Sequence, residues 1–254
     1  MKSIKAISLV VLLSTLTIAA ENNFERTEKA LKQAIESEIR TEKEKERDGN
    51  RRAIQTLKFF GFRDDMTAVE LFPGGGWYSK ILAPSLKQHG KYYAALGAGR
   101  VKNSLLSHKG FEKAQVLESG ESLERNTESR FYEISDFNFG INNVDIVFTF
   151  RNYHNFDEAS RKLINQKVFA ALKPGGIYAV VDHTRRHMQE LDNENGRRVD
   201  PVLAIKEIQQ AGFKFVDFSD MHYRADDELR YEVGRKTVTG NTDRFTIKFI
   251  KPKK

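Results

Sequence analysis

The sequence predicts an α/β fold built on a mostly parallel sheet of seven strands with helices on both faces. From residue 67 onward, short runs of β-branched and aromatic residues alternate with stretches of helical periodicity. Apolar strands separated by helices favour right-handed β-α-β crossovers, because helices cover both faces of a parallel sheet. The segment between the last two runs lacks helical periodicity, so we expect the last strand to be antiparallel.

The same pattern places the individual elements. We expect strands at Ala68–Phe72, Lys91–Leu96, Phe131–Ile134, Val144–Phe150, Ile177–Asp182, Phe213–Phe218 and Phe245–Ile250. We expect helices at Tyr78–Gln88, Asn103–Ala114, Asp157–Leu172 and Val202–Ala211. These elements make residues 61–254 one α/β domain, preceded by a helical extension over residues 21–60 and a leader over residues 1–20.

The extension is dense in charge but nearly neutral. Residues 21–58 hold ten basic and nine acidic side chains. An amphipathic helix is expected first, then a break at Asp48-Gly49-Asn50 and a short helix at about Arg51–Phe60. The first helix places four apolar residues near one face: Phe24, Leu31, Ile35 and Ile39. We interpret the extension as a solvated lid packed on the domain, because a nucleic-acid arm would carry one sign of charge.

The first twenty residues have the pattern of a secretory signal peptide. Lys2 and Lys5 precede an apolar run from Ile7 to Ile18, and small residues allow cleavage after Ala19 or Ala20. The run is short for a membrane span, which needs roughly 20 apolar residues. We therefore expect a periplasmic or secreted protein without stable membrane insertion, unless the leader is uncleaved and acts as an anchor.

Composition narrows the classes of function. The chain has no cysteine, which excludes a disulfide scaffold, a thiolate nucleophile and a cysteine zinc site. Lys and Arg exceed Asp and Glu by 42 − 35 = 7, and loss of Lys2 and Lys5 leaves +5. No basic stripe is present, so nucleic acid is not expected as a partner. We expect no metal site, and the oligomeric state stays open.

A glycine-rich turn follows the first strand of the domain. Ala68-Val-Glu-Leu-Phe-Pro-Gly-Gly-Gly-Trp-Tyr78 runs from a strand through Gly74, Gly75 and Gly76 into a helix. Glycines let the backbone turn sharply and approach a ligand, and ligands of open parallel sheets bind at this edge. Glu70 precedes the turn and either binds a ligand or organises the loop. Trp77 either covers a ligand or packs against the helix start.

Three segments together resemble class I S-adenosylmethionine-dependent methyltransferases. They are Glu70…Pro73-Gly-Gly-Gly76, Val144-Asp-Ile-Val-Phe-Thr-Phe150 and Leu172-Lys-Pro-Gly-Gly-Ile-Tyr178. The resemblance covers about residues 51–254. It implies a Rossmann-like fold, with S-adenosylmethionine as cofactor and the glycine turn holding its methionine part. More narrowly, the sequence resembles predicted exported bacterial methyltransferases with "FPGGGWY", "RNYHN" and "VVDHTRR" segments.

The sequence departs from that family at the second strand. In the family an acidic residue usually ends this strand and binds the ribose, whereas here the strand ends Ala95-Leu-Gly-Ala-Gly99. Either the alignment is shifted, or another group binds the ribose, or the cofactor site has decayed. By family analogy Asp136, after the expected third strand, contacts the adenine amine, although an ordinary turn explains it equally well.

Polar side chains follow the fourth and fifth strands at the same sheet edge. Parallel strands bring their carboxyl ends together, so we expect six residues to converge on one crevice. We assign acid–base and positioning roles to His154, His183 and Asn152, because two histidines allow proton transfer near neutral pH. Substrate binding is assigned to Arg151, Asp182 and Arg185. A single histidine here would more simply be a hydrogen-bonded loop residue.

Two functions of different class follow. The first is a methyltransferase acting on an unidentified small-molecule acceptor. The second is an exported, non-catalytic ligand-binding protein on a methyltransferase-like fold, which the missing acidic residue and the leader both favour.

Overall fold

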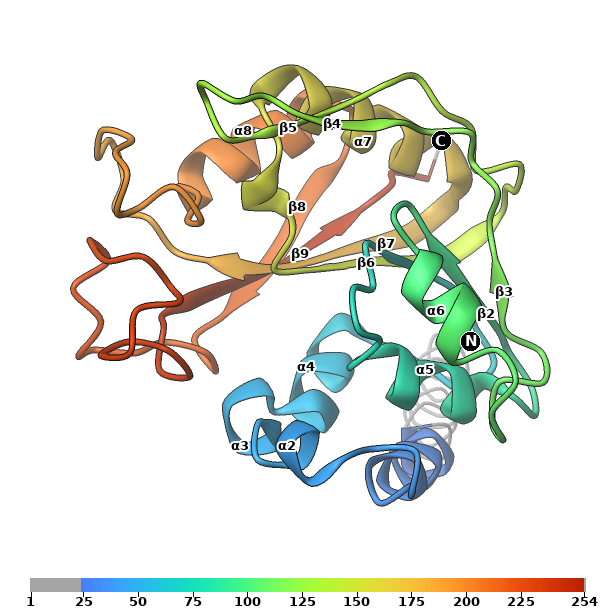
Figure 1. Cartoon of the computed structure of the whole chain (residues 1–254). Coiled ribbons are helices and arrows are strands. Elements are labelled where there is room, and N and C mark those ends of the chain that lie inside the picture. The colour runs from blue at the N-terminus through green and yellow to red at the C-terminus, as the bar shows by residue number, and fades with distance from the viewer. Residues whose placement is uncertain (1–23, 254) are drawn as a thin grey trace, which may run out of the picture.

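The computed structural model describes residues 24–253, so the predicted leader lies outside the described residues. Its central sheet has seven strands in the order β3-β2-β1-β6-β7-β9-β8. The expected Rossmann-like methyltransferase architecture is confirmed: β3, β2, β1, β6 and β7 run parallel, and β9 pairs antiparallel with both β7 and β8. Helices cover both faces of this sheet (Figure 1).

The strands follow the apolar runs closely. They are β1 (Thr67–Leu71), β2 (Lys91–Ala95), β3 (Gln115–Val116), β6 (Val144–Phe150), β7 (Leu172–His183), β8 (Lys214–Ser219) and β9 (Arg244–Ile250). The sequence of β6, Val-Asp-Ile-Val-Phe-Thr-Phe, is buried except at Asp145, as expected for a strand covered on both faces.

One predicted strand was misplaced. Phe131–Ile134 was expected as the third strand of the sheet, but β5 (Tyr132–Ile134) pairs antiparallel with β4 (Leu123–Arg125) in a separate two-stranded sheet. There Ile134 donates its backbone N–H to Ser160 Oγ on α7 (Glu158–Ala171). The third strand of the main sheet is β3, whose two residues carry too short a pattern to be recognised.

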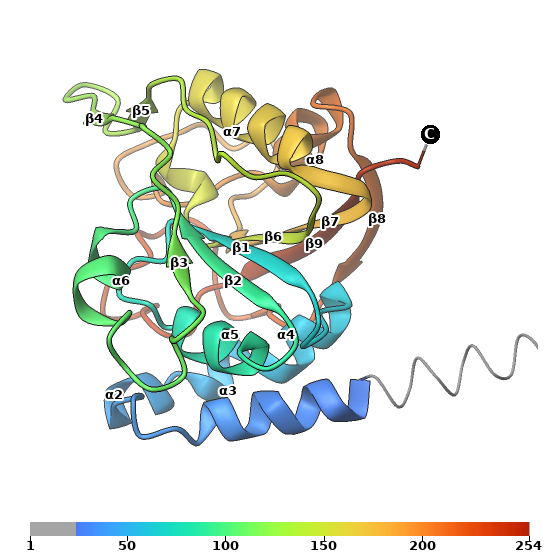
Figure 2. The same cartoon turned by 90° about the vertical axis from the view of Figure 1, so that its right-hand side faces the viewer.

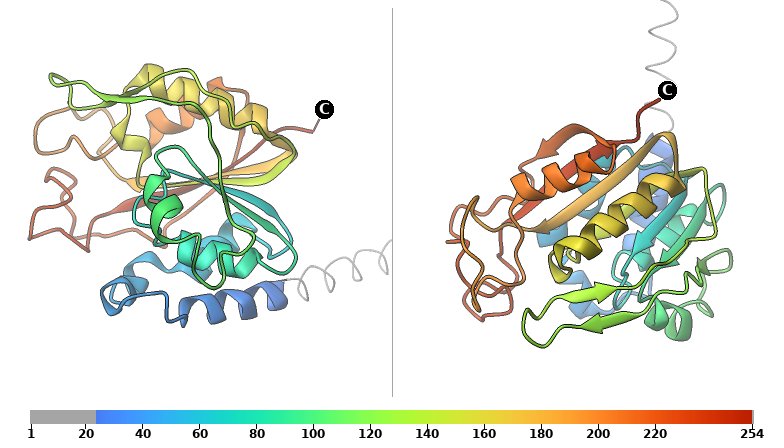
Figure 3. Two further views of the ribbon diagram at one scale, coloured as in Figure 1. Left: turned by 45° about the vertical axis from the view of Figure 1, so that its right-hand side comes forward. Right: turned by 90° about the horizontal axis from the view of Figure 1, so that it is seen from above.

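The helices lie in two layers. One layer holds a helix over residues 24–35, α2 (Glu42–Lys45), α3 (Asp48–Arg51), α4 (Ala53–Phe60) and α5 (Ser79–Leu86). The other holds α7 and α8 (Pro201–Gln210), with the β4–β5 hairpin beside them (Figures 2 and 3). The two layers occupy opposite faces of the sheet, so the predicted extension is a structural part of the first layer.

Two helix boundaries differ from expectation. The stretch Asp48-Gly49-Asn50 was expected to break the chain, yet it belongs to α3, and the break falls at Arg52 in a left-handed conformation. The helix expected at Asn103–Ala114 is the shorter and earlier α6 (Gly99–Ser104). Turns follow it and end near Gly110, which has a φ of +97° and lies against Pro84.

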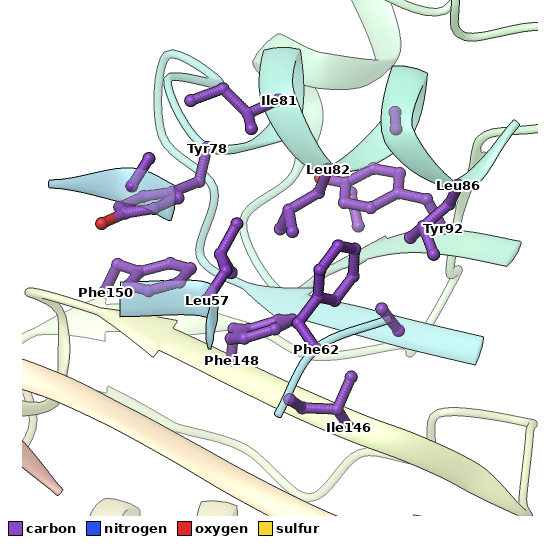
Figure 4. Packing of buried hydrophobic residues seen from close by; sticks show 14 of the residues in the cluster. Leu57, Phe62, Tyr78, Ile81, Leu82, Leu86, Tyr92, Ile146, Phe148 and Phe150 are labelled. Atoms are coloured by element: carbon purple, nitrogen blue, oxygen red, sulfur yellow. The ribbon is translucent and has the colours of Figure 1, made fainter. Parts of the chain in front are cut away.

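Two hydrophobic clusters fill the space on either side of the sheet. The first joins Leu31, Leu57 and Phe60 of the extension to Phe148 and Phe150 of β6. Figure 4 shows the ring of Tyr78 lying over Phe150, with centroids 3.6 Å apart. The second cluster packs α7 and α8 on the opposite face. The extension therefore packs on the domain through buried apolar residues of this first cluster.

Candidate active site

Three neighbouring strands leave the sheet through residues in the left-handed conformation. Phe72 follows β1, Leu96 follows β2 and Arg151 follows β6, with φ values of 50°, 57° and 60°. This conformation costs a non-glycine residue free energy and tends to persist at functional sites. The strand order reverses between β1 and β6, and ligands of open α/β sheets bind at such a switch point. The residues in the left-handed conformation therefore lie at the same edge of the sheet as the polar residues that follow the strands.

The glycines of the turn have different reasons to be glycine. Gly74 and Gly76 have φ values of +57° and +78°, and a Cβ on Gly76 would lie 2.4 Å from Leu105 Cδ1. Gly75 is exposed, has no positive φ, and would place a Cβ more than 4 Å from any neighbouring atom. Nothing in the protein requires glycine at position 75, and the bare backbone there leaves room for the close approach of a ligand.

Glu70 is buried beneath this turn. Ser79 Oγ and Tyr92 Oη each donate to Glu70 Oε2 at 2.7 Å. Burial raises the pKa of Glu70 to about 7, and the two hydrogen bonds only partly oppose this rise. Glu70 therefore ties the start of α5 to β2. Of its two predicted roles, organising the loop is the one these contacts support.

Two adjoining cavities open at this edge. The small cavity, about 220 Å³, lies over the glycine turn and is lined by Gly74, Gly75, Glu70 and Asn152 among others. The large cavity, about 660 Å³, lies beyond it and is lined by His154, His183 and Thr242 among others. Both are lined by four further residues: Glu44, Arg47, Arg51 and Arg151. A ligand spanning both would touch the glycine turn and the histidines together.

The N-terminal segment of residues 40–51 closes one side of both cavities. Trp77 Nε1 donates to the carbonyl oxygen of Glu44 at 2.9 Å, and Lys80 Nζ lies 2.9 Å from the Glu44 carboxylate. The Trp77 ring also receives the guanidinium groups of Arg40 and Arg51, at 5.0 and 4.3 Å from its centroid. Trp77 therefore anchors this segment rather than simply packing against its own helix.

His154 and Asp182 form a buried pair at the ends of β6 and β7. His154 Nδ1 lies 2.5 Å from Asp182 Oδ1, and the His154 backbone N–H donates to Asp182 Oδ2 at 2.9 Å. A carboxylate at Nδ1 fixes the tautomer that carries its proton there, which leaves Nε2 as the basic nitrogen. Asp182 was predicted to bind substrate, but it is fully buried and positions His154 instead.

His183 lies beside this pair. The ring centroids of His154 and His183 are 5.7 Å apart, and Thr242 Oγ1 lies 3.0 Å from His183 Nδ1. Burial, and then the neighbouring His154 and Arg151, lower the pKa of His183 well below its ordinary value. His183 is thus a neutral imidazole at physiological pH. The two histidines lie in one crevice, as the sequence predicted.

Asn152 has its amide group occupied by the backbone. Its Nδ2 donates to the carbonyl oxygens of Phe72 and Phe150 at 3.0 and 2.9 Å. These bonds link the end of β1 to the end of β6 across the switch point. The contacts give Asn152, predicted as catalytic, a positioning role.

Four arginines line the cavities without a carboxylate partner among residues 24–253, and one of them, Arg47, is exposed. Arg51 and Arg244 are buried, and Arg151 is partly buried. Burial lowers the pKa of Arg51 to about 8 and that of Arg244 to about 10, and repulsion from Arg151 adds to both shifts. The site is therefore strongly cationic.

Two other candidates, Asp136 and Arg185, line neither of these cavities, and neither does the neighbouring Arg198. Asp136 is exposed and pairs with Lys167 Nζ at 2.7 Å, on the hairpin side of α7. Its assignment depended on the misplaced third strand. Arg185 lines a different cavity of about 240 Å³, which touches the far side of His154. Arg198 is buried in an ion pair with Asp227 and is not free for a ligand.

Sequence reasoning missed part of the site. Arg51 and Glu44 come from the extension, whose balanced charge gave no sign that single residues would point into a cavity. Thr242 comes from the loop before β9 and Arg244 is the first residue of β9, both far along the chain from the histidines. No local pattern distinguishes these residues, because their roles depend on contacts between distant segments.

Several solved structures with a similar fold are S-adenosylmethionine-dependent methyltransferases. One from Aquifex aeolicus superposes with a TM-score of 0.54 at 16% identity, covering 78% of this chain and 88% of its own. Human N-acetylserotonin methyltransferase, solved with S-adenosylmethionine, gives 0.52 at 13%, covering 83% and 54%. The SpnF [4+2]-cyclase gives 0.50 at 13%, covering 80% of each chain. The chain has the methyltransferase fold. At these identities the likeness concerns the fold alone.

The sequence matches no family model, and the described residues contain neither a membrane-spanning helix nor a metal site. No protein-family model and no curated protein matches this sequence. Within residues 24–253, no helix is both long and apolar enough to cross a bilayer. No group of three or more His, Asp or Glu side chains in that range is arranged to hold a metal ion.

Proposed function

We propose that this protein is an S-adenosylmethionine-dependent methyltransferase acting on a small-molecule acceptor. The observation that carries the proposal is the His154–Asp182 pair, set at the switch point of a methyltransferase fold and beside the glycine turn. A base at this place serves a reaction in which an acceptor loses a proton as it gains a methyl group.

The residues of the small cavity fit the methionine part of the cofactor. Gly75 presents bare backbone to it, with open space where a side chain would stand. The carboxylate missing from the end of β2 has a counterpart, because Glu121 Oε1 accepts the Gly97 N–H at 3.0 Å. We propose that this downstream carboxylate takes the ribose-binding role that the family usually gives to an acidic residue on the strand itself.

When bound, S-adenosylmethionine supplies an electrophilic methyl group. The chain's own contribution is positioning and proton transfer, as expected for an in-line displacement. His154 Nε2 takes the acceptor proton, and Asp182 stabilises the resulting imidazolium through Nδ1. His183, held neutral by burial, keeps a second positive charge away from that imidazolium.

Export is part of the proposal and rests on residues 1–20 alone. It would place the protein in the periplasm or outside the cell, as in the exported methyltransferases that its motifs resemble. Export separates the protein from cytosolic S-adenosylmethionine, which favours the second candidate, an exported ligand-binding protein without catalysis. The [4+2]-cyclase with this fold illustrates that the fold does not dictate the reaction.

Calorimetry on the full-length chain tests the proposal. We expect S-adenosylmethionine and S-adenosylhomocysteine to bind, and Gly75→Val to lose binding without loss of stability. Gly196→Val is the control, because Gly196 lines neither cavity, has no positive φ, and would place a Cβ in ordinary contact, 3.7 Å from the Asp192 carbonyl oxygen. Ligand at about 100 times its dissociation constant should stabilise the fold by about 2.7 kcal/mol.

A second variant separates catalysis from binding. His154→Gln should retain cofactor affinity but lose methyl transfer, by about 10²- to 10⁴-fold if the imidazole acts as general base. Absence of cofactor binding by a well-folded wild-type protein would refute the methyltransferase proposal and leave the binding-protein candidate.

A further inference from the structure

We propose that the large cavity binds an organic anion, whose carboxylate or phosphate group lies among Arg51, Arg151 and Arg244. Under the proposed function, on which this step rests, that anion is the methyl acceptor. The observation behind it is a group of buried cations that the protein itself does not neutralise.

Arg51 is the most unusual of these cations. Its side chain is 5% exposed, and its Nε has no hydrogen-bond partner. The guanidinium packs over the rings of Trp77 and Tyr78, at 4.3 and 5.8 Å from their centroids, and forms no ion pair within residues 24–253. Removing a cation from water without a counter-ion costs free energy. Proteins therefore rarely keep a buried, unpaired cation unless a ligand supplies the counter-ion.

Arg151 and Arg244 extend the same cationic wall. Arg151 is held in the left-handed conformation at the end of β6, and its guanidinium forms no ion pair with a described residue. Arg244 donates through one NH2 group to the Asn50 carbonyl oxygen at 2.6 Å, whereas its Nε is buried without a partner. Two buried guanidinium groups without a counter-ion among residues 24–253 therefore line the large cavity, each with a buried Nε that has no hydrogen-bond partner.

Two of the three nearby carboxylates are already committed, and the third is exposed to solvent. Glu44 pairs with Lys80, and Asp182 accepts from His154 Nδ1 and from the backbone N–H groups of His154 and His183. Glu46 is exposed at the rim. Guanidinium groups present planar forks that match carboxylate and phosphate oxygens, so an oxyanion is the chemical class that these donors select.

Charge balance indicates that the anion is the acceptor rather than the cofactor. S-adenosylmethionine has a sulfonium, an ammonium and a carboxylate, and thus a net charge of +1. The single cofactor carboxylate would face Arg51 and Arg151, which also line the small cavity, but the cofactor's two positive charges leave a cationic excess that a second, anionic ligand would neutralise. The large cavity also holds His154, so an acid anchored by the arginines has its reacting group within reach of the proposed base.

Matched probes test this inference on the full-length protein without cofactor. Benzoate and phenyl phosphate carry the two candidate oxyanions, and benzamide and benzyl alcohol are neutral analogues of similar shape. We expect at least one anion to bind saturably and to raise Tm, and the neutral analogues to do neither. Arg51→Gln and Arg151→Gln should each weaken anion binding at least tenfold. Exposed Arg125→Gln, on β4, should not.

Stability of the free protein gives an independent readout. If Arg51 and Arg151 have no counter-ion until an anion binds, replacing either residue with Gln removes an uncompensated charge. The Tm of the ligand-free chain should then rise. A lower Tm with unchanged anion affinity would mean a structural role and would overturn the inference. Equal binding of benzoate and benzamide would overturn it as well.

The outcome is separable from that of the proposed function. Cofactor binding without anion preference would leave the methyltransferase proposal standing and refute the anion site. Anion binding without cofactor binding would support the site and refute the methyltransferase proposal, leaving an exported anion-binding protein.

Discussion

At the scale of single residues, the site depends on burial more than on residue type. His154 and His183 are near neighbours in a common crevice, yet one contacts a carboxylate and the other a hydroxyl. The carboxylate gives His154 a fixed tautomer, whereas burial beside cations keeps His183 neutral. Two copies of one side chain are therefore suited to different tasks, a base and a neutral hydrogen-bonding partner.

Glu70 gives a prediction about stability and pH. Its pKa rises from an ordinary 4.5 to about 7 in the folded state, so the folded protein binds more protons than the unfolded chain between these values. The free energy of unfolding should fall as pH rises from 4.5 to 7, by about 3 kcal/mol, and be flat in this respect above pH 7.

Glu70→Gln isolates this effect. The amide can accept from Ser79 and Tyr92 but cannot ionise, so the variant should lack the decline and be more stable than wild type at pH 8. Denaturant unfolding at several pH values measures the difference between the two proteins. Parallel profiles would show that Glu70 does not titrate in this range.

At the scale of elements, the N-terminal segment of residues 40–51 is held by one tryptophan. Trp77 stands directly after the glycine turn, and it binds the segment by one hydrogen bond and two cation–π contacts. The glycine turn and the N-terminal segment, which line the small cavity together, are thus held to each other by Trp77. Any ligand in the small cavity touches both sides of this link.

Trp77→Phe should loosen that segment without unfolding the protein. The variant loses the Nε1 hydrogen bond, worth about 1 kcal/mol, and part of the cation–π attraction. Amide hydrogen exchange in residues 40–51 should become several-fold faster, while exchange in β6 is unchanged. Exchange that accelerates equally throughout the chain would indicate global destabilisation instead. Lys102→Gln, which breaks an exposed ion pair with Glu118, is the control.

At the scale of the whole molecule, the loop between β8 and β9 is anchored by a buried ion pair. Arg198 Nη1 and Nη2 contact the Asp227 carboxylate at 2.9 and 3.0 Å, and both side chains are fully buried. Asp227 Oδ2 also accepts the Asp243 N–H at 2.7 Å. This loop carries Thr242 to His183, so the pair fixes one wall of the large cavity.

Asp227→Asn should be strongly destabilising. The change leaves the buried Arg198 guanidinium without its counter-ion. We expect the free energy of unfolding to fall by about 3–5 kcal/mol. The exposed Arg197–Glu232 pair of the same region provides the comparison, and Glu232→Gln should cost less than about 1 kcal/mol. Equilibrium denaturation of the wild type and the two variants measures these differences. Similar losses of unfolding free energy in both variants would contradict the role given to the buried pair.

The sequence predicted much of this architecture because most of its strands are strongly encoded. Buried runs such as Val144–Phe150 are apolar throughout, and glycine and proline mark the turns beside them. The two-residue β3 was missed because an edge strand of this length leaves almost no pattern. Phe131–Ile134 was misplaced because β-branched and aromatic residues predict a strand but not its partner.

The sequence by itself determined the fold class, the glycine turn and the sheet edge at which the functional residues meet. Periodicity and strand order are local properties, and parallel strands necessarily bring their carboxyl ends together. Only the tertiary structure decided which residue each side chain faces. It paired Asp182 with His154, withdrew Asp136 and Arg185 from the cavities, and brought Arg51 and Arg244 into them. Burial and charge compensation depend on contacts between residues far apart in the chain, which no local pattern records.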